Sequence, residues 1–272
     1  MGSGIAEVCA RSGVDVTVVE VDPGHAERSQ AAIAKSLDRG VRAGKLSEED
    51  RSAAWDRLVY TADIEDVAGA DAAIEAIIED EQAKREIFKR LDKILPDARF
   101  LASNTSSVPI MKLGAGTSQP HRVLGLHFFN PVPVLPLVEI VHSIMTAPET
   151  ANEAREFAEK TLGKECIDSQ DRAGFVVNAL LIPYLLSSIR MFESGFASKE
   201  DIDDGMRLGC AHPMGPLALS DLIGLDTLQA VATSLYEEFR DPSSVAPALL
   251  NRMVEAGLLG RKSGRGFYEY SK

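Results

Sequence analysis

The 272-residue sequence has few cysteines, no excess of positive charge and no long hydrophobic run. Its three cysteines, Cys9, Cys166 and Cys210, form no C-x-x-C pair, so we expect reduced thiols in a cytoplasmic protein and neither disulfides nor a metal site. The net charge of -12 argues against nucleic acid or an anionic membrane surface as the main partner. The most apolar stretch, residues 174–186, contains Asn and Pro and is shorter than the roughly 20 residues that span a bilayer.

What the sequence does contain is an alternation of short apolar runs and amphipathic stretches. Strands are predicted at residues 14–21, 58–63, 72–79, 99–106, 122–131 and 137–143. With helices between them, residues 1–170 are expected to form an α/β domain with a Rossmann-like, doubly wound, mostly parallel sheet. Residues 171–272 are expected to form an all-α domain, with helices at 174–194, 199–208, 216–238 and 246–256. The segment "SQDRAG", residues 169–174, is the expected linker.

The first residues are typical of a dinucleotide-binding unit from its last glycines onward. Gly2 stands where a helix begins, so a pyrophosphate could approach the backbone N–H groups and the positive end of the helix dipole. Glu20 follows the next strand, where an acid binds the adenosine ribose, and its charge favours NAD over NADP. A complete unit has a strand and two more glycines before this point, so we expect the first strand to be missing from this chain. The alternative is that Gly2 and Glu20 are an incidental glycine and an exposed strand end.

Two ionisable residues, His127 and Glu139, lie twelve residues apart in apolar strands. A carboxylate beside a histidine fixes its tautomer and stabilises its cation, which suits a general base near neutral pH. The segment "SNTSS", residues 103–107, adds hydroxyl and amide groups after a strand, and Asn178 lies in an apolar helix start. The alternatives are a satisfied core histidine, a capped loop and a buried amide.

A basic stripe runs along the helix predicted at residues 24–46. Lys35, Arg39 and Arg42 are spaced i, i+4, i+7, and Lys45 is expected one turn further on. In a protein of net charge -12, such a stripe could bind the phosphates of a carrier such as coenzyme A. The alternative is a solvated helix face with ion pairs.

Seven segments together resemble the 3-hydroxyacyl-CoA dehydrogenase family, in particular its short, single-function 3-hydroxybutyryl-CoA members. They occur in family order and span almost the whole chain: "MGSGIAEVCARSG", "IIEDEQAKREIFKRLD", "LASNTSS", "GLHFFNPVPVLPLVEIV", "DRAGFVVNALLIPYL", "HPMGPLALSDLIGLDT" and "GRKSGRGFYEY". The combination of "HFFNPVP", "GFVVN" and "PMGP" is much more specific than a glycine pattern. The resemblance implies an NAD-binding domain at residues 1–170 and a substrate-binding, dimerising helical domain at 171–272.

The resemblance also implies roles for individual residues. His127 would remove the proton of the 3-hydroxyl while hydride passes from C3 to NAD, and Glu139 would orient the histidine. Ser106 and Asn178 would bind the reacting oxygen and position the substrate. The implied cofactor contacts are Met1, Gly2, Glu20, Glu79, Lys84, Ser106, Asn130 and Lys262, with Met1 inside the glycine loop. The implied substrate contacts are Ser36, Lys45, Ser106 and Asn178.

The expected function is the reversible oxidation of a (3S)-3-hydroxyacyl-CoA to the 3-oxoacyl-CoA with NAD, by a homodimer. One alternative is a related dehydrogenase that acts on a free hydroxy acid or sugar acid. Another is an acyl-CoA-binding or structural protein without a cofactor. Because these alternatives differ in the ligands they bind, thioester and NADH binding distinguish them.

Overall fold

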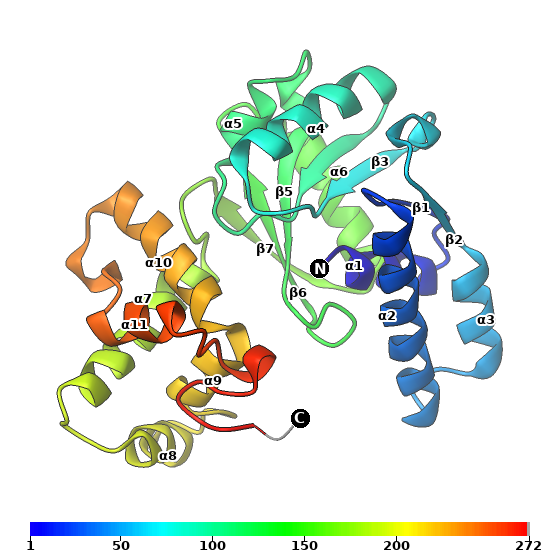
Figure 1. Cartoon of the computed structure of the whole chain (residues 1–272). Helices are drawn as coiled ribbons and strands as arrows, with labels where there is room; N and C mark the ends of the chain where they lie inside the picture. Colours follow the sequence, from blue (N-terminus) through cyan, green and yellow to red (C-terminus); the bar gives the residue numbers. More distant parts are fainter. Residues whose placement is uncertain (271–272) are drawn as a thin grey trace. The chain divides into compact units, whose positions relative to one another are not determined.

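The computed structural model describes residues 1–270 and divides between Asp171 and Arg172 into two compact units. Each unit has its own hydrophobic core. The first unit contains an α/β arrangement and the second is helical, as the alternation of apolar runs predicts. Figure 1 shows the two units, which are described separately below.

The first unit alternates strands and helices. Its strands are β1 (Val16–Val19), β2 (Leu58–Thr61), β3 (Ala72–Glu75), β4 (Phe100–Ser103), β5 (Val123–Phe128), β6 (Leu137–His142) and β7 (Glu165–Gln170). Its helices are α1 (Gly2–Arg11), α2 (Pro23–Arg42), α3 (Glu48–Asp56), α4 (Glu81–Ile94), α5 (Ile110–Gly114) and α6 (Pro148–Glu156). Side-chain caps fix several helix starts, because Asp22, Ser47 and Asp80 accept hydrogen bonds from the first turns of α2, α3 and α4.

The strands form a parallel pair, β1–β2, and a five-stranded sheet in the order β3-β4-β5-β6-β7. The larger sheet is parallel except between β5 and β6, so the prediction of a mostly parallel sheet is confirmed. Helix α1 packs against both groups of strands, because Ile5 and Val8 share a hydrophobic cluster with Val16 of β1 and Ile74 of β3. Figure 1 shows α2 and α3 beside β1 and β2, and α4 beside α5.

Two expectations for the first unit are met only in part. The apolar run at 14–21 predicts a buried strand, yet β1 alternates between half-buried and exposed residues and Val21 beyond it is exposed. The boundary between the two units lies within the expected linker at 169–174, but residues 169 and 170 still belong to β7. The sequence pattern did not predict β7, because half of its residues are exposed and few of them are apolar.

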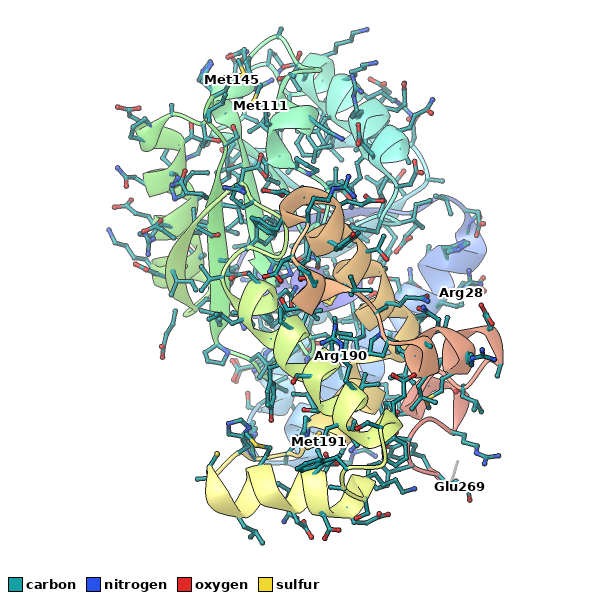
Figure 2. All side chains as sticks on the ribbon, turned by 90° about the vertical axis from the view of Figure 1, so that its left-hand side faces the viewer. Arg28, Met111, Met145, Arg190, Met191 and Glu269 are labelled. Atoms are coloured by element: carbon teal, nitrogen blue, oxygen red, sulfur yellow. The ribbon has the colours of Figure 1, made fainter. Side chains whose placement is uncertain are left out.

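The second unit is a group of helices around a core that includes Leu185, Leu217 and Leu228. Its helices are α7 (Val177–Glu193), α8 (Lys199–Gly209), α9 (Pro216–Ile223), α10 (Leu225–Phe239) and α11 (Ala248–Glu255). Arg190 on α7, labelled in Figure 2, donates hydrogen bonds to the carbonyl groups of three residues in segment 242–245. The single helix predicted at 216–238 is wrong: Gly224, with φ of 102°, separates α9 from α10.

Candidate active site

Strand pairing brings His127 and Glu139 together. The two residues lie directly opposite each other in the antiparallel pair of β5 and β6. His127 Nδ1 lies 2.6 Å from Glu139 Oε2, and the histidine is 4% exposed while the glutamate is 0% exposed. The carboxylate therefore accepts the Nδ1 hydrogen, and the Nε2 atom becomes the basic end of the ring.

The alternation of side chains along β5 determines which face of the sheet carries His127. Leu124, Leu126 and Phe128 belong to the apolar cluster formed with residues of α1 and α6. Successive side chains of a strand point to opposite faces, so His127 points away from that cluster. The ring of Phe129 meets the imidazole edge-on, with the ring centroids 4.7 Å apart. The imidazole is thus held by a carboxylate at one nitrogen and by an aromatic ring beside it.

Ser106 provides the hydroxyl group at the other imidazole nitrogen. Its Oγ atom lies 3.0 Å from His127 Nε2. It belongs to the loop that follows β4, and Asn104 in the same loop accepts a hydrogen bond from the Phe128 N–H at 2.8 Å. The loop after β4 is therefore attached directly to the end of β5. Three of the predicted residues, His127, Glu139 and Ser106, meet in one place.

Glu79 organises this loop. One of its oxygen atoms, Oε1, accepts hydrogen bonds from Thr105 Oγ1, the Ser106 N–H, the Ser107 N–H and Ser107 Oγ. Burial raises the pKa of the Glu79 carboxyl. The Thr105 hydroxyl, the Lys84 ammonium and the Ser106 N–H outweigh that effect, so this pKa lies below its ordinary value. Glu79 is therefore ionised at neutral pH and holds Ser106 in position.

Lys84 is buried, and its ammonium group bridges two carboxylates. Its Nζ atom lies 2.7 Å from Glu75 Oε1 and 3.2 Å from Glu79 Oε2. Sequence reasoning did not identify Glu75. The signal was nevertheless present, because Glu75 is an acid inside an apolar strand, which is the pattern that singled out Glu139.

The start of α1 fits the pyrophosphate of a dinucleotide. Met1 is the N-cap residue without a side-chain cap, and the first turn has no acidic residue that would repel an anion. Open N–H groups at a helix start bind phosphate. A Cβ atom added at Gly2 would lie 3.7 Å from the Cβ atom of Ala76, so this helix start lies beside the end of β3. Glu20 directly follows β1 and is half-buried.

The remaining predicted residues are placed as follows. Asn130 is exposed in the loop after β5. Asn178 and Lys262 belong to the second unit. Asn178 is half-buried in the first turn of α7. The Nζ atom of Lys262 lies 2.5 Å from Asp226 Oδ2. Their part in the site remains a prediction.

The basic stripe is only partly as expected. Lys35, Arg39 and Arg42 are exposed on α2, but Lys45 lies beyond the end of that helix, because the chain turns at Gly44 with φ of 66°. Burial raises the pKa of the Glu7 carboxyl on α1, and the Ser36 hydroxyl on α2 lowers it in part. In the part of the chain that the structure describes, no helix is long and apolar enough to cross a membrane.

Comparisons with known proteins agree on one family. The family model for the 3-hydroxyacyl-CoA dehydrogenase NAD binding domain matches residues 1–172, and that for the C-terminal domain matches residues 174–270. A 3-hydroxybutyryl-CoA dehydrogenase of Mycobacterium tuberculosis is 57% identical over 99% of this chain and 95% of the relative.

Two solved structures are also similar. The crystal structure of M. tuberculosis FadB2 has a TM-score of 0.98 at 56% identity, covering 100% of this chain and 95% of that chain. That of the (S)-3-hydroxybutyryl-CoA dehydrogenase PaaH1 from Ralstonia eutropha has a TM-score of 0.93 at 45% identity, covering 100% of this chain and 96% of that chain. Both solved structures therefore match the fold over the full length of this chain.

Proposed function

Because the chain belongs to the 3-hydroxyacyl-CoA dehydrogenase family, we propose that it oxidises a (3S)-3-hydroxyacyl-CoA reversibly to the 3-oxoacyl-CoA, with NAD as cofactor. The relatives named above suggest a short acyl chain, with 3-hydroxybutyryl-CoA as the substrate. The observation that carries the proposal is the alignment of Glu139, His127 and Ser106 by two hydrogen bonds.

The arrangement assigns a task to each of these three residues. His127 Nε2 takes the proton of the 3-hydroxyl group, because Nδ1 already holds a hydrogen bonded to Glu139. The Glu139 carboxylate stabilises the imidazolium that forms, at a distance of 2.6 Å and away from solvent. Ser106 Oγ, 3.0 Å from Nε2, holds the reacting oxygen beside the base. In the reverse direction the imidazolium returns the proton to that oxygen.

NAD supplies the hydride acceptor when it is bound. We propose that Met1 and Gly2, at the start of α1, bind its pyrophosphate and that Glu20 binds its ribose. Glu79, Ser106 and Asn130 follow strands of the same sheet and are assigned to the cofactor site. The Lys84 ammonium is buried between two carboxylates, so we propose that it contributes to the cofactor site by holding Glu79 in position.

For the substrate, we propose that the exposed basic residues of α2 attract the phosphates of coenzyme A. Lys35, Arg39 and Arg42 carry three positive charges in a chain of net charge -12. Ser36 and Lys45 lie beside this stripe and are assigned to the same contact. Asn178 is assigned to the reacting oxygen of the substrate.

We further propose that the enzyme is a cytoplasmic homodimer that associates through its helical unit. The three cysteines are free thiols, as is usual in a reducing compartment. Leu180, Phe196 and Leu208 are large apolar side chains exposed in the second unit, which is the kind of surface that a subunit contact covers.

The experiment that tests the proposed function compares acetoacetyl-CoA with free acetoacetate, following NADH oxidation. We expect kcat/KM for the thioester to exceed that for the free acid by at least about 100-fold, since only the thioester carries the coenzyme A phosphates. Equal values would favour a free hydroxy acid or sugar acid as the substrate. Absence of NADH binding in a fluorescence titration would favour the acyl-CoA-binding or structural alternative.

A further inference from the structure

A fully buried carboxylate lies behind the loop that carries Ser106. Glu75 ends β3, and its side chain is inaccessible to solvent. Oε1 accepts hydrogen bonds from Lys84 Nζ at 2.7 Å and from the Ile77 N–H at 2.6 Å. Oε2 accepts one from Ser103 Oγ at 2.6 Å. A buried carboxylate with three donors is held in one place, because moving away from any of them loses a hydrogen bond that no water replaces.

Two chains of contacts lead from Glu75 to the loop. The first passes through Lys84, whose ammonium is shared with Glu79, the residue that gathers four donors of residues 105–107. The second passes through Ser103, whose Oγ donates to Glu75 and accepts the Thr105 N–H at 3.2 Å. Both chains end on the residues directly before and around Ser106.

The position of Glu75 is set by the sheet itself. Glu75 and Ser103 are register partners in the parallel pair of β3 and β4, so the backbone ladder fixes their separation. Lys84 lies in α4. Asp80 caps the start of this helix, because its carboxylate accepts a hydrogen bond from the Ala83 N–H at 2.8 Å. The network is therefore built on two strands and a helix, which position a side chain more rigidly than a loop does.

We propose that Glu75 is a positioning residue of the active site, which sets the Ser106 hydroxyl at His127 through Ser103, Lys84 and Glu79. Glu75 does not touch the reacting atoms; it determines where the loop between β4 and α5 lies. The inference rests on the proposed function, because the loop matters for catalysis only if Ser106 holds the reacting oxygen.

A double-mutant cycle of Glu75→Gln and Ser106→Ala tests this positioning, measured as kcat and KM for acetoacetyl-CoA with NADH. We expect Glu75→Gln alone to lower kcat about 10- to 100-fold, since a small misplacement of a positioning group has effects of this size. In the Ser106→Ala background the same change should lower kcat less than about twofold. An equal loss in both backgrounds, or no loss in the wild-type background, would overturn the proposal.

Two further variants separate positioning from general damage. Ser103→Ala removes one chain of contacts without leaving a charge unpaired, and it should show the same dependence on Ser106. The control Glu81→Gln, at the start of the same helix, breaks two exposed ion pairs, with Lys112 at 2.6 Å and with Arg85 at 3.7 Å, and should leave kcat unchanged. A Ser103→Ala enzyme with wild-type kcat would contradict the proposal even if Glu75→Gln does not fold.

A structural readout keeps the inference separate from the proposed function. In crystals of Ser103→Ala or Glu75→Gln, we expect Ser106 Oγ to lie beyond hydrogen-bonding distance of His127 Nε2, against 3.0 Å in the wild-type chain. An unchanged distance would overturn the inference. This result does not depend on activity, whereas failure of the wild-type protein to reduce acetoacetyl-CoA would refute only the proposed function.

Discussion

The imidazole of His127 has both nitrogen atoms engaged by named side chains, Glu139 on one side and Ser106 on the other. Burial strengthens the interaction with Glu139, because little water is available to screen the carboxylate from the imidazolium. The histidine beside that carboxylate offsets part of the cost of burying it. The pair therefore serves both the fold and the chemistry, and removing one partner harms both.

Glu79 gives a prediction at the residue scale, because its pKa is lowered in the folded chain. A carboxyl whose pKa is lower when folded stabilises the protein above its unfolded pKa, and this stabilisation is lost as the pH falls through the folded pKa. The free energy of unfolding should therefore fall less steeply in Glu79→Gln than in the wild type, between about pH 5 and 3. Urea titrations followed by fluorescence of Trp55, the single tryptophan, measure this in the first unit.

The matched control for this titration is Glu86→Gln on α4. Glu86 is exposed, and its carboxylate lies 3.7 Å from Lys89 Nζ. An exposed pair contributes little, so this variant should follow the wild-type pH dependence. A Glu79→Gln curve parallel to the wild-type curve would show that the hydrogen bonds to Glu79 do not stabilise the ionised form.

At the scale of elements, α5 begins without a cap of its own. Its N-cap residue is Pro109, and the first N–H groups, those of Ile110 and Met111, donate to the Asp171 carboxylate at 2.8 and 2.7 Å. Met111 is labelled in Figure 2. A residue at the end of β7 therefore caps a helix 60 positions earlier in the chain. This contact joins the last strand of the sheet to the segment that follows the Ser106 loop.

Asp171→Ala should lower the free energy of unfolding of the first unit by about 1–2 kcal/mol, the usual contribution of a helix cap. Urea denaturation followed by Trp55 fluorescence measures the change. Asp97→Ala, which removes an exposed aspartate from the loop after α4, is the control and should have less than about 0.5 kcal/mol of effect. Equal stability of the two variants would show that Asp171 does not hold α5.

The sequence predicted some elements and site residues correctly and missed others, and the reasons are physical. His127 and Glu139 were identifiable because a charged group in an apolar strand requires a partner. Their register and the approach of Ser106 depend on strand pairing, which local patterns do not encode. The prediction missed β7 because few of its residues are apolar, and it passed over Glu75 although an acid in an apolar strand is the signal that identified Glu139. Lys45 was predicted to lie on the same helix as the basic stripe, but this helix ends at Arg42 in the structure. A pattern of basic residues does not indicate where a helix ends.

At the scale of the whole molecule, the large exposed apolar side chains of the second unit are the main guide to assembly. Sedimentation should give twice the chain mass of 29.3 kDa, and Phe196→Glu should shift the protein toward the monomer, because Phe196 is 79% exposed. Ile144→Glu, at a residue 90% exposed in the first unit, is the control and should leave the mass unchanged. A wild-type protein that sediments at the monomer mass would contradict the homodimer.

The general-base role of His127 is the step on which the chemistry of this NAD-dependent 3-hydroxyacyl-CoA dehydrogenase depends. It is tested most directly by kcat for acetoacetyl-CoA reduction in His127→Ala, with NADH affinity measured by fluorescence in the same protein. We predict a loss of kcat of about 10²–10⁴ with NADH affinity retained, the range expected when a general acid–base group is removed. A loss of less than about tenfold, in a variant that still binds NADH, would contradict the account.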